Sequence, residues 1–372
     1  MRYAHITGWG MAVPERVLTN AEIAQMVDTS EEWIFSRTGI CERRIVDDEQ
    51  STATLAADSA LQALEVADLN PADVDLIIVA SSSPEHFFPS TASLVQDSIG
   101  AVKAGAFDLS AACTGFILAV NMAAQAIKTG SIENAIVVGA ETLSRLTNWE
   151  DRNTCILFGD GAGAFVLQAS DERGGVLSAV MRSDGSGGDL LSVPAGGSKL
   201  PTSDETVARG QHFIHMKGRE VFRFAIRVMA QATREVVSLA GLELDDIDLI
   251  VPHQANKRII ESAARGLKLP LERFAVNVDR YGNTSTASVP IAAVEAIREG
   301  RLNPGDRVVF VGFGGGLTWG AVAAQWTGPL SDERRKAWPY RFDRLFALYV
   351  SLRSTVLRIL RYIEGLIWTR EE

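Results

Sequence analysis

Apolar residues along the chain recur every three or four positions in some segments and form short continuous runs in others. The first pattern predicts helices, and the second predicts short buried strands. Residues 53–80 contain a helical pattern, a turn at "LNPADVD" and an apolar run "LIIVAS". Residues 225–252 repeat that order with a helical pattern, then "LELDDID" and "LIVPH". Helices that alternate with short apolar strands are typical of α/β layers with mainly parallel strands.

These two segments indicate an internal duplication. Aligning "ADVDLIIVA" with "DDIDLIVPH" sets an offset of 173 residues, and "NAIVVGAETLS" with "DRVVFVGFGGG" forms a second pair of buried runs. Repetition at about half the chain predicts two similar halves stacked together, although any α/β protein shows some echoes of this kind. We expect a first half over 1–172 and a second half over 173–328.

The segment 329–372 differs from both halves, and we expect a linker, "SDERRKAWP", followed by an amphipathic helix over 342–368. It carries nine Lys/Arg and six Asp/Glu, a net of +3 in a chain of net charge -10. Pro339 marks the entry of the helix, and arginines recur too often for a membrane-spanning segment. Three alternatives are open: packing on its own enzyme or a dimer mate, lying on an anionic membrane surface, or docking to another protein. The apolar residues of this segment recur at helical spacing: Phe342, Leu345, Phe346, Tyr349, Leu352, Val356, Ile359, Leu360, Ile363, Leu366 and Ile367. Its basic residues are Arg344, Arg353, Arg358 and Arg361.

The composition narrows the class of protein. The 372 residues are 47% hydrophobic and 22% charged, as in ordinary globular proteins. The net charge of -10 argues against wholesale nucleic-acid binding. Three cysteines without paired spacing indicate a reducing compartment, and neither a signal region nor a spanning apolar run is present.

Glycine-rich stretches interrupt the pattern at "GDGAGAF" (159–165), "SDGSGGD" (183–189) and "GFGGGLTWG" (312–320). None has the spacing of a P-loop, and no G-x-G-x-x-G opens a helix after a strand. We expect loops around a site, where glycine permits tight turns and close backbone approach. The absence of a dinucleotide fingerprint argues against a dehydrogenase.

Cys113 is the candidate nucleophile. "GAFDLSAAC" predicts a strand that turns sharply, and "TGFILAVNMAAQAIKTG" predicts a helix ending at Gly130. Cys113 then lies at a helix N-terminus, where the helix dipole favours the thiolate that attacks thioesters. The usual alternative is a buried cysteine acting as a small hydrophobe. Cys41 and Cys155 lack this setting and are expected to be structural.

His253 and Asn283 are candidate partners of that cysteine. His253 ends the strand of the second repeat in "IVPHQANKRII", and Asn283 lies in the polar loop "YGNTSTAS". Both side chains can donate hydrogen bonds to a developing oxyanion. Each taken alone is usually a satisfied polar residue, but their positions at comparable turns of two repeated halves favour a site.

The ordered motifs "EEWIFSRTGICERRI", "DLSAACTGF", "FGDGAGA", "HQAN", "YGNTS" and "GFGGGLTWG" closely resemble those of the β-ketoacyl-acyl-carrier-protein synthase III family. The resemblance covers about residues 1–327. It implies the thiolase-like, duplicated αβαβα five-layer fold, here with a C-terminal helical extension. It also implies a homodimer that condenses an acyl-CoA primer with malonyl-acyl-carrier protein, with loss of carbon dioxide, to start fatty-acid synthesis. No permanently bound cofactor and no metal is implied, and acyl-CoA is a substrate.

The resemblance assigns roles to residues of this chain. Cys113 is the acylated nucleophile, and His253 and Asn283 promote malonyl decarboxylation. The backbone N–H groups of Cys113 and Gly315 form an oxyanion hole. The remaining assignments place Trp33 and Arg152 around the adenine of coenzyme A, Arg37 near its phosphates, Lys257 and Arg258 against the carrier protein, and Phe88 across the dimer in the partner's acyl pocket.

Two positions depart from the family pattern and leave the primer open. Thr286 stands where alanine is usual, and Leu317 where phenylalanine is frequent, so either affects the size of the acyl pocket. A related Cys-His-Asn ketosynthase of polyketide or secondary metabolism is the nearest alternative. An inactive scaffold held to a membrane or partner by its tail is the alternative of another class. We expect a cytoplasmic enzyme, with or without peripheral membrane association through 342–368.

Overall fold

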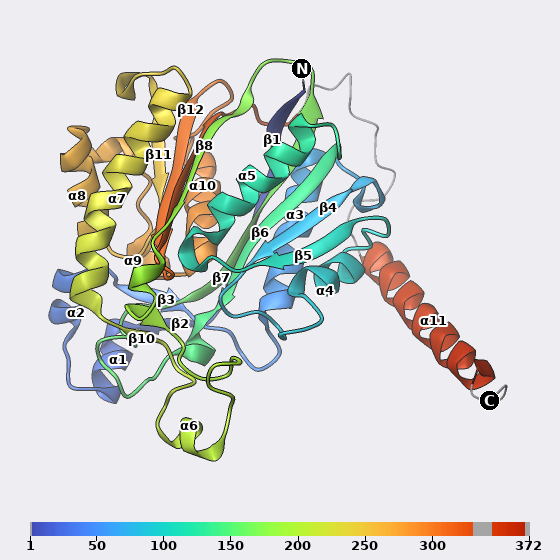
Figure 1. Cartoon of the computed structure of the whole chain (residues 1–372), viewed down its shortest axis with the longest axis horizontal. Coiled ribbons are helices and arrows are strands. Elements are labelled where there is room, and N and C mark those ends of the chain that lie inside the picture. Colours follow the sequence, from blue (N-terminus) through green and yellow to red (C-terminus); the bar gives the residue numbers. More distant parts are fainter. Residues whose placement is uncertain (1, 330–343, 369–372) are drawn as a thin grey trace.

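The computed structural model describes residues 2–329 and 344–368. The expected linker "SDERRKAWP", its Pro339 and Phe342 lie outside the described residues. Two main sheets stand face to face in Figure 1, with helices outside and between them. In sheet order, the first contains β1 (Tyr3–Ala12), β7 (Asp160–Ser170), β6 (Asn134–Thr142), β4 (Leu76–Ala80) and β5 (Gly105–Leu109). The second contains β11 (Leu249–Pro252), β12 (Arg307–Gly314), β13 (Thr318–Gln325) and β8 (Gly175–Ser183).

The strand directions explain the sequence pattern. In the first sheet β6, β4 and β5 run parallel to one another. On the other side of β6, β7 pairs antiparallel with β6, and β1 pairs antiparallel with β7. The second sheet repeats this arrangement: β11 is parallel to β12, β13 pairs antiparallel with β12, and β8 pairs antiparallel with β13. Parallel strands covered on both faces need continuous apolar runs, which is what "LIIVA" and "LIVP" supply. Two small sheets pair β2 (Val17–Thr19) with β3 (Glu42–Arg44) and β9 (Leu191–Ser192) with β10 (His215–Met216).

Helices make the other three layers, so the expected duplicated αβαβα fold is confirmed. Helices α3 (Thr52–Ala67) and α4 (Thr91–Ser98) cover the outer face of the first sheet. Helices α5 (Gly115–Lys128) and α10 (Ser288–Arg298) lie between the sheets. Helices α7 (Gly218–Leu239) and α8 (Lys257–Leu267) cover the outer face of the second sheet. The shorter helices are α1 (Asn20–Met26), α2 (Glu31–Thr38), α6 (Asp204–Ala208) and α9 (Val278–Tyr281).

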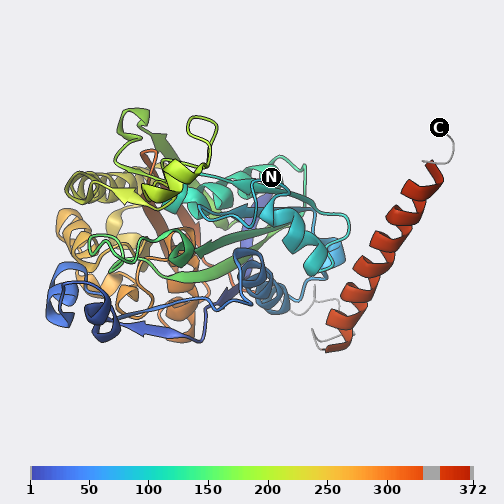
Figure 2. The same ribbon diagram turned by 90° about the horizontal axis from the view of Figure 1, so that it is seen from below.

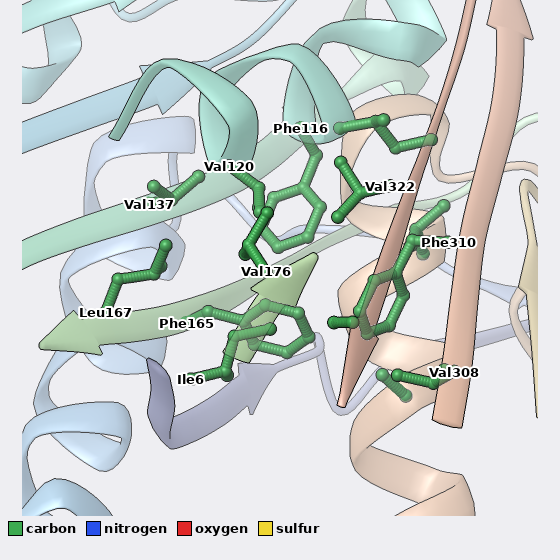
Figure 3. Close-up of a cluster of buried hydrophobic side chains, with 14 of the residues drawn as sticks. Ile6, Phe116, Val120, Val137, Phe165, Leu167, Val176, Val308, Phe310 and Val322 are labelled. Atoms are coloured by element: carbon green, nitrogen blue, oxygen red, sulfur yellow. The ribbon is translucent and has the colours of Figure 1, made fainter. Parts of the chain in front are cut away.

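The central layer is a single apolar core shared by both halves (Figure 3). Phe116 of α5, Phe165 of β7 and Phe310 of β12 meet there, with ring centroids 5.1 Å apart for the first pair and 5.5 Å for the second. Offset and edge contacts between such rings add to the stabilisation from burial. The halves are therefore held together by the same core that fixes α5, the helix that follows Cys113.

The offset of 173 residues relates several elements of the two halves. It places the first four residues of β4 on the whole of β11 and the first residue of α5 on the first residue of α10. It also relates the single 3₁₀ turns Ala112–Thr114 and Ser285–Ala287, whose first residues Ala112 and Ser285 both have φ of 46°. All strands of the first sheet come from residues up to Ser170, and all strands of the second sheet come from Gly175 onward. The domain limits 1–172, 173–328 and 329–372 stay predictions.

The glycine-rich stretch 159–165 is not a loop, which corrects the expectation for it. Residues from Asp160 onward form β7, and Gly163 faces α10 so closely that a Cβ there would lie 2.7 Å from the Pro290 side chain. Its glycines permit close packing between a strand and a helix. Likewise, most of 312–320 belongs to β12 and β13, whereas 183–189 is irregular except for one 3₁₀ turn.

The last element is α11 (Arg344–Trp368), which lies within the predicted helical segment. It contacts α4 and extends away from the rest of the molecule, as Figures 1 and 2 both show. Among the described residues, no helix is both long and apolar enough to cross a membrane.

Candidate active site

Cys113 lies where the sequence predicts, beyond a strand and before a helix, but its immediate setting differs. It is the middle residue of the 3₁₀ turn Ala112–Thr114, directly before α5, and only 7% of it is exposed. The left-handed φ of Ala112 makes the sharp turn out of β5. This turn brings the Cys113 backbone next to β12, since a Cβ on Gly314 would lie 2.6 Å from the Cys113 nitrogen.

The thiol of Cys113 is not the thiolate that a helix N-terminus favours. Burial raises its pKa to about 12, and the charge of Glu141 raises it further, while a hydrogen bond with the Ser285 side chain lowers it. Removing the thiol from water therefore outweighs the hydrogen bonds that lower its pKa. Cys113 needs a proton acceptor before it can attack a thioester.

This pKa predicts how fast Cys113 reacts with iodoacetamide. Because only the thiolate reacts, the rate at Cys113 should rise about tenfold per pH unit between pH 7 and pH 10, without a plateau. Ser285→Ala should slow the reaction further at each pH, since it removes the hydrogen bond that lowers the pKa. Peptide mass spectrometry resolves Cys113 from Cys41 and Cys155. A plateau near neutral pH would show that the thiol is already ionised.

His253 and Cys113 line the same small cavity of about 80 Å³, together with Asn283. His253 follows β11 and its backbone N–H bonds to Val311 on β12. A Cβ on Gly312 would lie 3.4 Å from the His253 Cβ and 3.7 Å from the Cys113 carbonyl oxygen, so only glycine separates them there. The structure thus brings the three predicted catalytic residues together.

The imidazole of His253 is neutral and held at one nitrogen. Burial lowers its pKa from 6.5 to about 3. Its Nδ1 lies 2.7 Å from Ser288 Oγ, and that hydroxyl also lies 2.8 Å from the Ser285 carbonyl oxygen. Among the described residues, its Nε2 is buried without a hydrogen-bond partner. When Ser288 donates to the carbonyl, Nδ1 must donate to Ser288, which leaves a lone pair on Nε2.

Ser288 is therefore expected to matter for turnover. In Ser288→Ala the His253 Nδ1 is left buried without its partner, which costs about 1–3 kcal/mol, so condensation should slow roughly tenfold or more. Steady-state rates across pH 5–9 measure the effect, and the pH profile should change with the rate. A loss of rate that only follows a fall in the thermal midpoint, with the pH profile unchanged, would contradict this role.

Asn283 is oriented by the turn that follows it. Its Oδ1 accepts a hydrogen bond from the Ser285 backbone N–H at 2.9 Å, which leaves the Nδ2 end of the amide as the donor. Its backbone is fixed as well, because Asn283 N donates to Leu157 O at 2.8 Å and Gly159 N donates to Asn283 O at 3.1 Å. The arrangement presents an amide donor and an imidazole nitrogen to one cavity.

Glu141 is a buried residue of this region that the sequence reading missed. It lies at the end of β6 with no exposed surface, and burial raises its pKa. The carboxylate accepts hydrogen bonds from Ser83 Oγ at 2.6 Å, from the Ser82 and Ser83 backbone N–H groups, and from Thr286 Oγ1 at 3.1 Å. It thereby ties the loop after β4 to the turn that holds Ser285. Its place at the tip of a buried strand, like that of His253, is the signal that could have revealed it.

A second cavity, of about 250 Å³, lies on another side of Cys113. It is lined by Cys113, Ser285 and Gly315 and by apolar side chains including Leu143, Phe158 and Ile214. Through Ser82, Leu146 and Val193 it adjoins a larger cavity of about 850 Å³, where Phe88 lies on the wall. Gly315 and Cys113 line the same cavity, and the role of Gly315 as an oxyanion donor stays a prediction.

Two residues predicted for the acyl pocket are not among the lining residues of these cavities. Thr286 is buried, and its hydroxyl donates to the Ala80 carbonyl at 2.9 Å and to Glu141. Leu317 is buried against Gly187, in the apolar core of the second half. Any effect of either residue on the primer is therefore indirect. Phe88, in contrast, is 87% exposed at the edge of the largest cavity.

The residues predicted for coenzyme A form one cluster. The guanidinium carbons of Arg37 and Arg152 lie 5.7 Å and 5.3 Å from the Trp33 ring centroid. Arg152 also donates to the Asp28 carbonyl at 2.9 Å. Two cations around an aromatic ring suit a ligand with a flat base and phosphates.

The predicted carrier-protein residues lie beside this cluster. Lys257 and Arg258 begin α8, where Asn256 Nδ2 donates to the Arg37 carbonyl at 2.9 Å. The Arg258 guanidinium lies 5.3 Å from the ring of Phe222, which lines the small cavity with Cys113. A basic group therefore lies close to a wall of the cavity that Cys113 lines.

Comparisons with known proteins agree with this arrangement. Residues 107–185 match the model of the family 3-oxoacyl-[acyl-carrier-protein (ACP)] synthase III, and 237–326 match the model of its C-terminal region. The β-ketoacyl-[acyl-carrier-protein] synthase III of Symbiobacterium thermophilum is 55% identical over 326 residues, which are 88% of this chain and 99% of that protein. That of Desulfitobacterium hafniense is 53% identical over 322 residues, 87% of this chain and 97% of the relative.

Solved structures are similar over a comparable share of the chain. The 3-oxoacyl-[acyl-carrier-protein] synthase III of Aquifex aeolicus has a TM-score of 0.80 at 45% identity, covering 87% of this chain and all of its own. A priming β-ketosynthase of a polyketide biosynthetic pathway has a TM-score of 0.82 at 34% identity, covering 88% of this chain and 98% of its own.

Proposed function

The chain belongs to the 3-oxoacyl-[acyl-carrier-protein] synthase III family, and from that membership we propose how its own residues carry the reaction. It is an acyltransferase of the thiolase-like fold that starts fatty-acid synthesis. It joins an acyl-CoA primer to malonyl-acyl-carrier protein through an acyl-cysteine, with loss of carbon dioxide. Both acyl groups arrive as thioesters, so the reaction needs no permanently bound cofactor. The observation that carries the proposal is the shared cavity of Cys113, His253 and Asn283.

In the first step Cys113 attacks the thioester of the primer. We assign acceptance of the thiol proton to His253 Nε2, because it is buried without a hydrogen-bond partner among the described residues and belongs to a side chain that lines the same cavity as Cys113. The backbone N–H groups of Cys113 and Gly315 stabilise the tetrahedral oxyanion, at about 3–4 kcal/mol for each donor. Collapse expels the coenzyme A thiolate, which takes the proton from His253. The acyl chain stays in the 250 Å³ cavity.

In the second step malonyl-carrier protein enters and loses carbon dioxide. The enolate oxygen that forms accepts a hydrogen bond from Asn283 Nδ2. His253 adds a second donor when its proton is on Nε2, which is the tautomer in which Ser288 donates to Nδ1. The enolate carbon then attacks the acyl-cysteine, and the Cys113 thiolate leaves to give the β-ketoacyl product.

The substrate carriers are proposed to bind at the surface clusters described above. Trp33, Arg37 and Arg152 hold the nucleotide of coenzyme A, and Lys257 and Arg258 meet the acidic carrier protein. We also propose a cytoplasmic homodimer. Strand β5 is an edge of its sheet with Phe107 partly exposed, and Phe88 stands exposed nearby in the sequence, where it can reach a partner's acyl pocket. The contact made by α11 lies outside this chemistry.

The direct test is condensation by the purified chain. We expect acyl-CoA and malonyl-acyl-carrier protein to give β-ketoacyl-carrier protein and carbon dioxide, both measured by mass spectrometry with labelled malonate. Acyl transfer from coenzyme A without a product from malonyl-carrier protein would favour the secondary-metabolism alternative. Absence of any acyl transfer would favour the inactive scaffold.

A further inference from the structure

Helix α11 presents an apolar face to solvent rather than to the enzyme. Five side chains, from 45 to 62% exposed, recur at helical spacing along one side. They are Leu352, Val356, Ile359, Leu360 and Ile363, here called the outer face. Their spacing of four, three, one and three residues places them on one side of a helix. A contiguous apolar surface of this kind is uncommon on a free protein.

The opposite side of α11 is the one that holds it to the enzyme. Val350 is buried, and Ser354 Oγ donates to Asp97 Oδ2 of α4 at 2.7 Å. Arg353 and Arg358 each place a guanidinium nitrogen 3.9 Å from the Asp97 carboxylate. The polar side of the helix therefore faces the body, and the outer face is left for another contact. A surface helix of a globular protein normally turns its apolar side to the core and its polar side to solvent, and α11 does the opposite.

Charge distinguishes between possible occupants of the outer face. The span 344–363 contains four arginines, Arg344, Arg353, Arg358 and Arg361, and no acidic residue, in a chain whose net charge is -10. Arg358 remains 76% exposed despite Asp97, Arg361 is exposed on the polar side of the helix, and Tyr362 is exposed at the edge of the outer face. Two copies of α11 packed together would bring two positively charged segments together. An anionic lipid surface instead offers apolar chains for the outer face and phosphates for the arginines.

We propose that the outer face of α11 lies on an anionic lipid surface and holds the enzyme there peripherally. Its apolar side chains enter the boundary between headgroups and acyl chains, and Arg358 and Arg361, on the polar side of the helix, attract the anionic headgroups. Since α11 extends away from the sheets in Figures 1 and 2, the acidic body can remain off the membrane. The proposal does not depend on the roles of Cys113, His253 or Asn283.

The test is cosedimentation of the full chain with vesicles. Phosphatidylcholine vesicles alone are compared with vesicles that also contain phosphatidylglycerol, at low and high salt. We expect binding only to the anionic vesicles, weakening as salt increases. The double variant Ile359→Gln/Ile363→Gln should bind at least roughly tenfold more weakly. Arg361→Gln should bind about fivefold more weakly, as expected for one cation near such a surface.

A matched control exchanges exposed apolar residues elsewhere. Val207→Gln/Leu239→Gln changes two side chains on α6 and α7, which are 48% and 62% exposed, and should bind as the unaltered chain does. Condensation activity in solution should be the same in all variants, so a failed catalytic mechanism cannot be mistaken for a failed membrane contact. Equal binding to neutral and anionic vesicles would overturn the proposal. So would absence of vesicle binding, or an oligomeric mass that falls in the α11 double variant.

Discussion

Cys113→Ala is expected to remove acyl transfer altogether, with a loss of condensation of roughly 10⁴-fold or more. No other described cysteine can replace it, because Cys113 alone lines the cavities that adjoin His253, Ser285 and Gly315. Intact-protein mass spectrometry after incubation with a panel of acyl-CoAs shows the acyl group directly. The same panel ranks the primers, which the sequence leaves open.

The controls for this experiment are the other two cysteines. Cys155 is buried beside Arg43, and Cys41 is exposed, and both thiols have pKa values raised chiefly by desolvation. Cys41→Ala and Cys155→Ala should each keep the full acyl adduct. If Cys113→Ala still gains an acyl group, the nucleophile is elsewhere. If the unaltered chain gains none from any acyl-CoA, the first half of the mechanism is wrong.

Asn283→Asp is expected to lower condensation by about 10²–10³-fold while leaving acylation of Cys113 nearly unchanged. The aspartate retains the oxygen that accepts from Ser285 N–H, so the turn is kept. It lacks the Nδ2 donor, and its charge opposes the enolate. Release of carbon dioxide from malonyl-carrier protein and the rate of acyl-adduct formation, measured on the same preparation, separate the two half-reactions.

His253→Ala should behave differently, because His253 is assigned to both half-reactions. We expect slower acylation of Cys113 as well as slower decarboxylation, each by about 10²–10³-fold. The comparison of the two variants is therefore more informative than either alone. Equal effects of Asn283→Asp on both steps would contradict the assignment of Asn283 to the enolate, and normal acylation in His253→Ala would show that another group accepts the thiol proton.

Much of the architecture could be predicted because buried positions are apolar and recur at the spacing of the helix or strand that contains them. The repeated runs "LIIVA" and "LIVP" are covered on both faces, so they had to be apolar, and their offset of 173 residues holds in the structure. His253 is predictable because it follows such a run, whereas Cys113 is predictable from its place between a strand and a helix. The stretch 159–165 was misjudged because glycines that permit helix packing on β7 look the same in sequence as glycines of a loop.

The interactions that tune the site were not predictable in the same way. Ser285 and Ser288 have ordinary polar surroundings in the sequence, and only the left-handed turn brings their hydroxyls to Cys113 and His253. The high pKa of Cys113 depends on burial from all sides, which a local helix-dipole argument omits. The direction of the apolar face of α11 depends likewise on which side α4 contacts.

The paired turns at Ala112 and Ser285 bear on how many acyl groups one chain can carry. The same offset that relates them places Thr286 at the position of Cys113 and Glu141 at that of Gly314. Gly314 allows close approach to the backbone of Cys113, whereas the Glu141 carboxylate accepts a hydrogen bond from the Thr286 hydroxyl. One copy of the turn thus places a thiol beside the cavities, and the hydroxyl of the other copy is held by Glu141. We therefore expect one acyl group per chain, and two in the proposed homodimer.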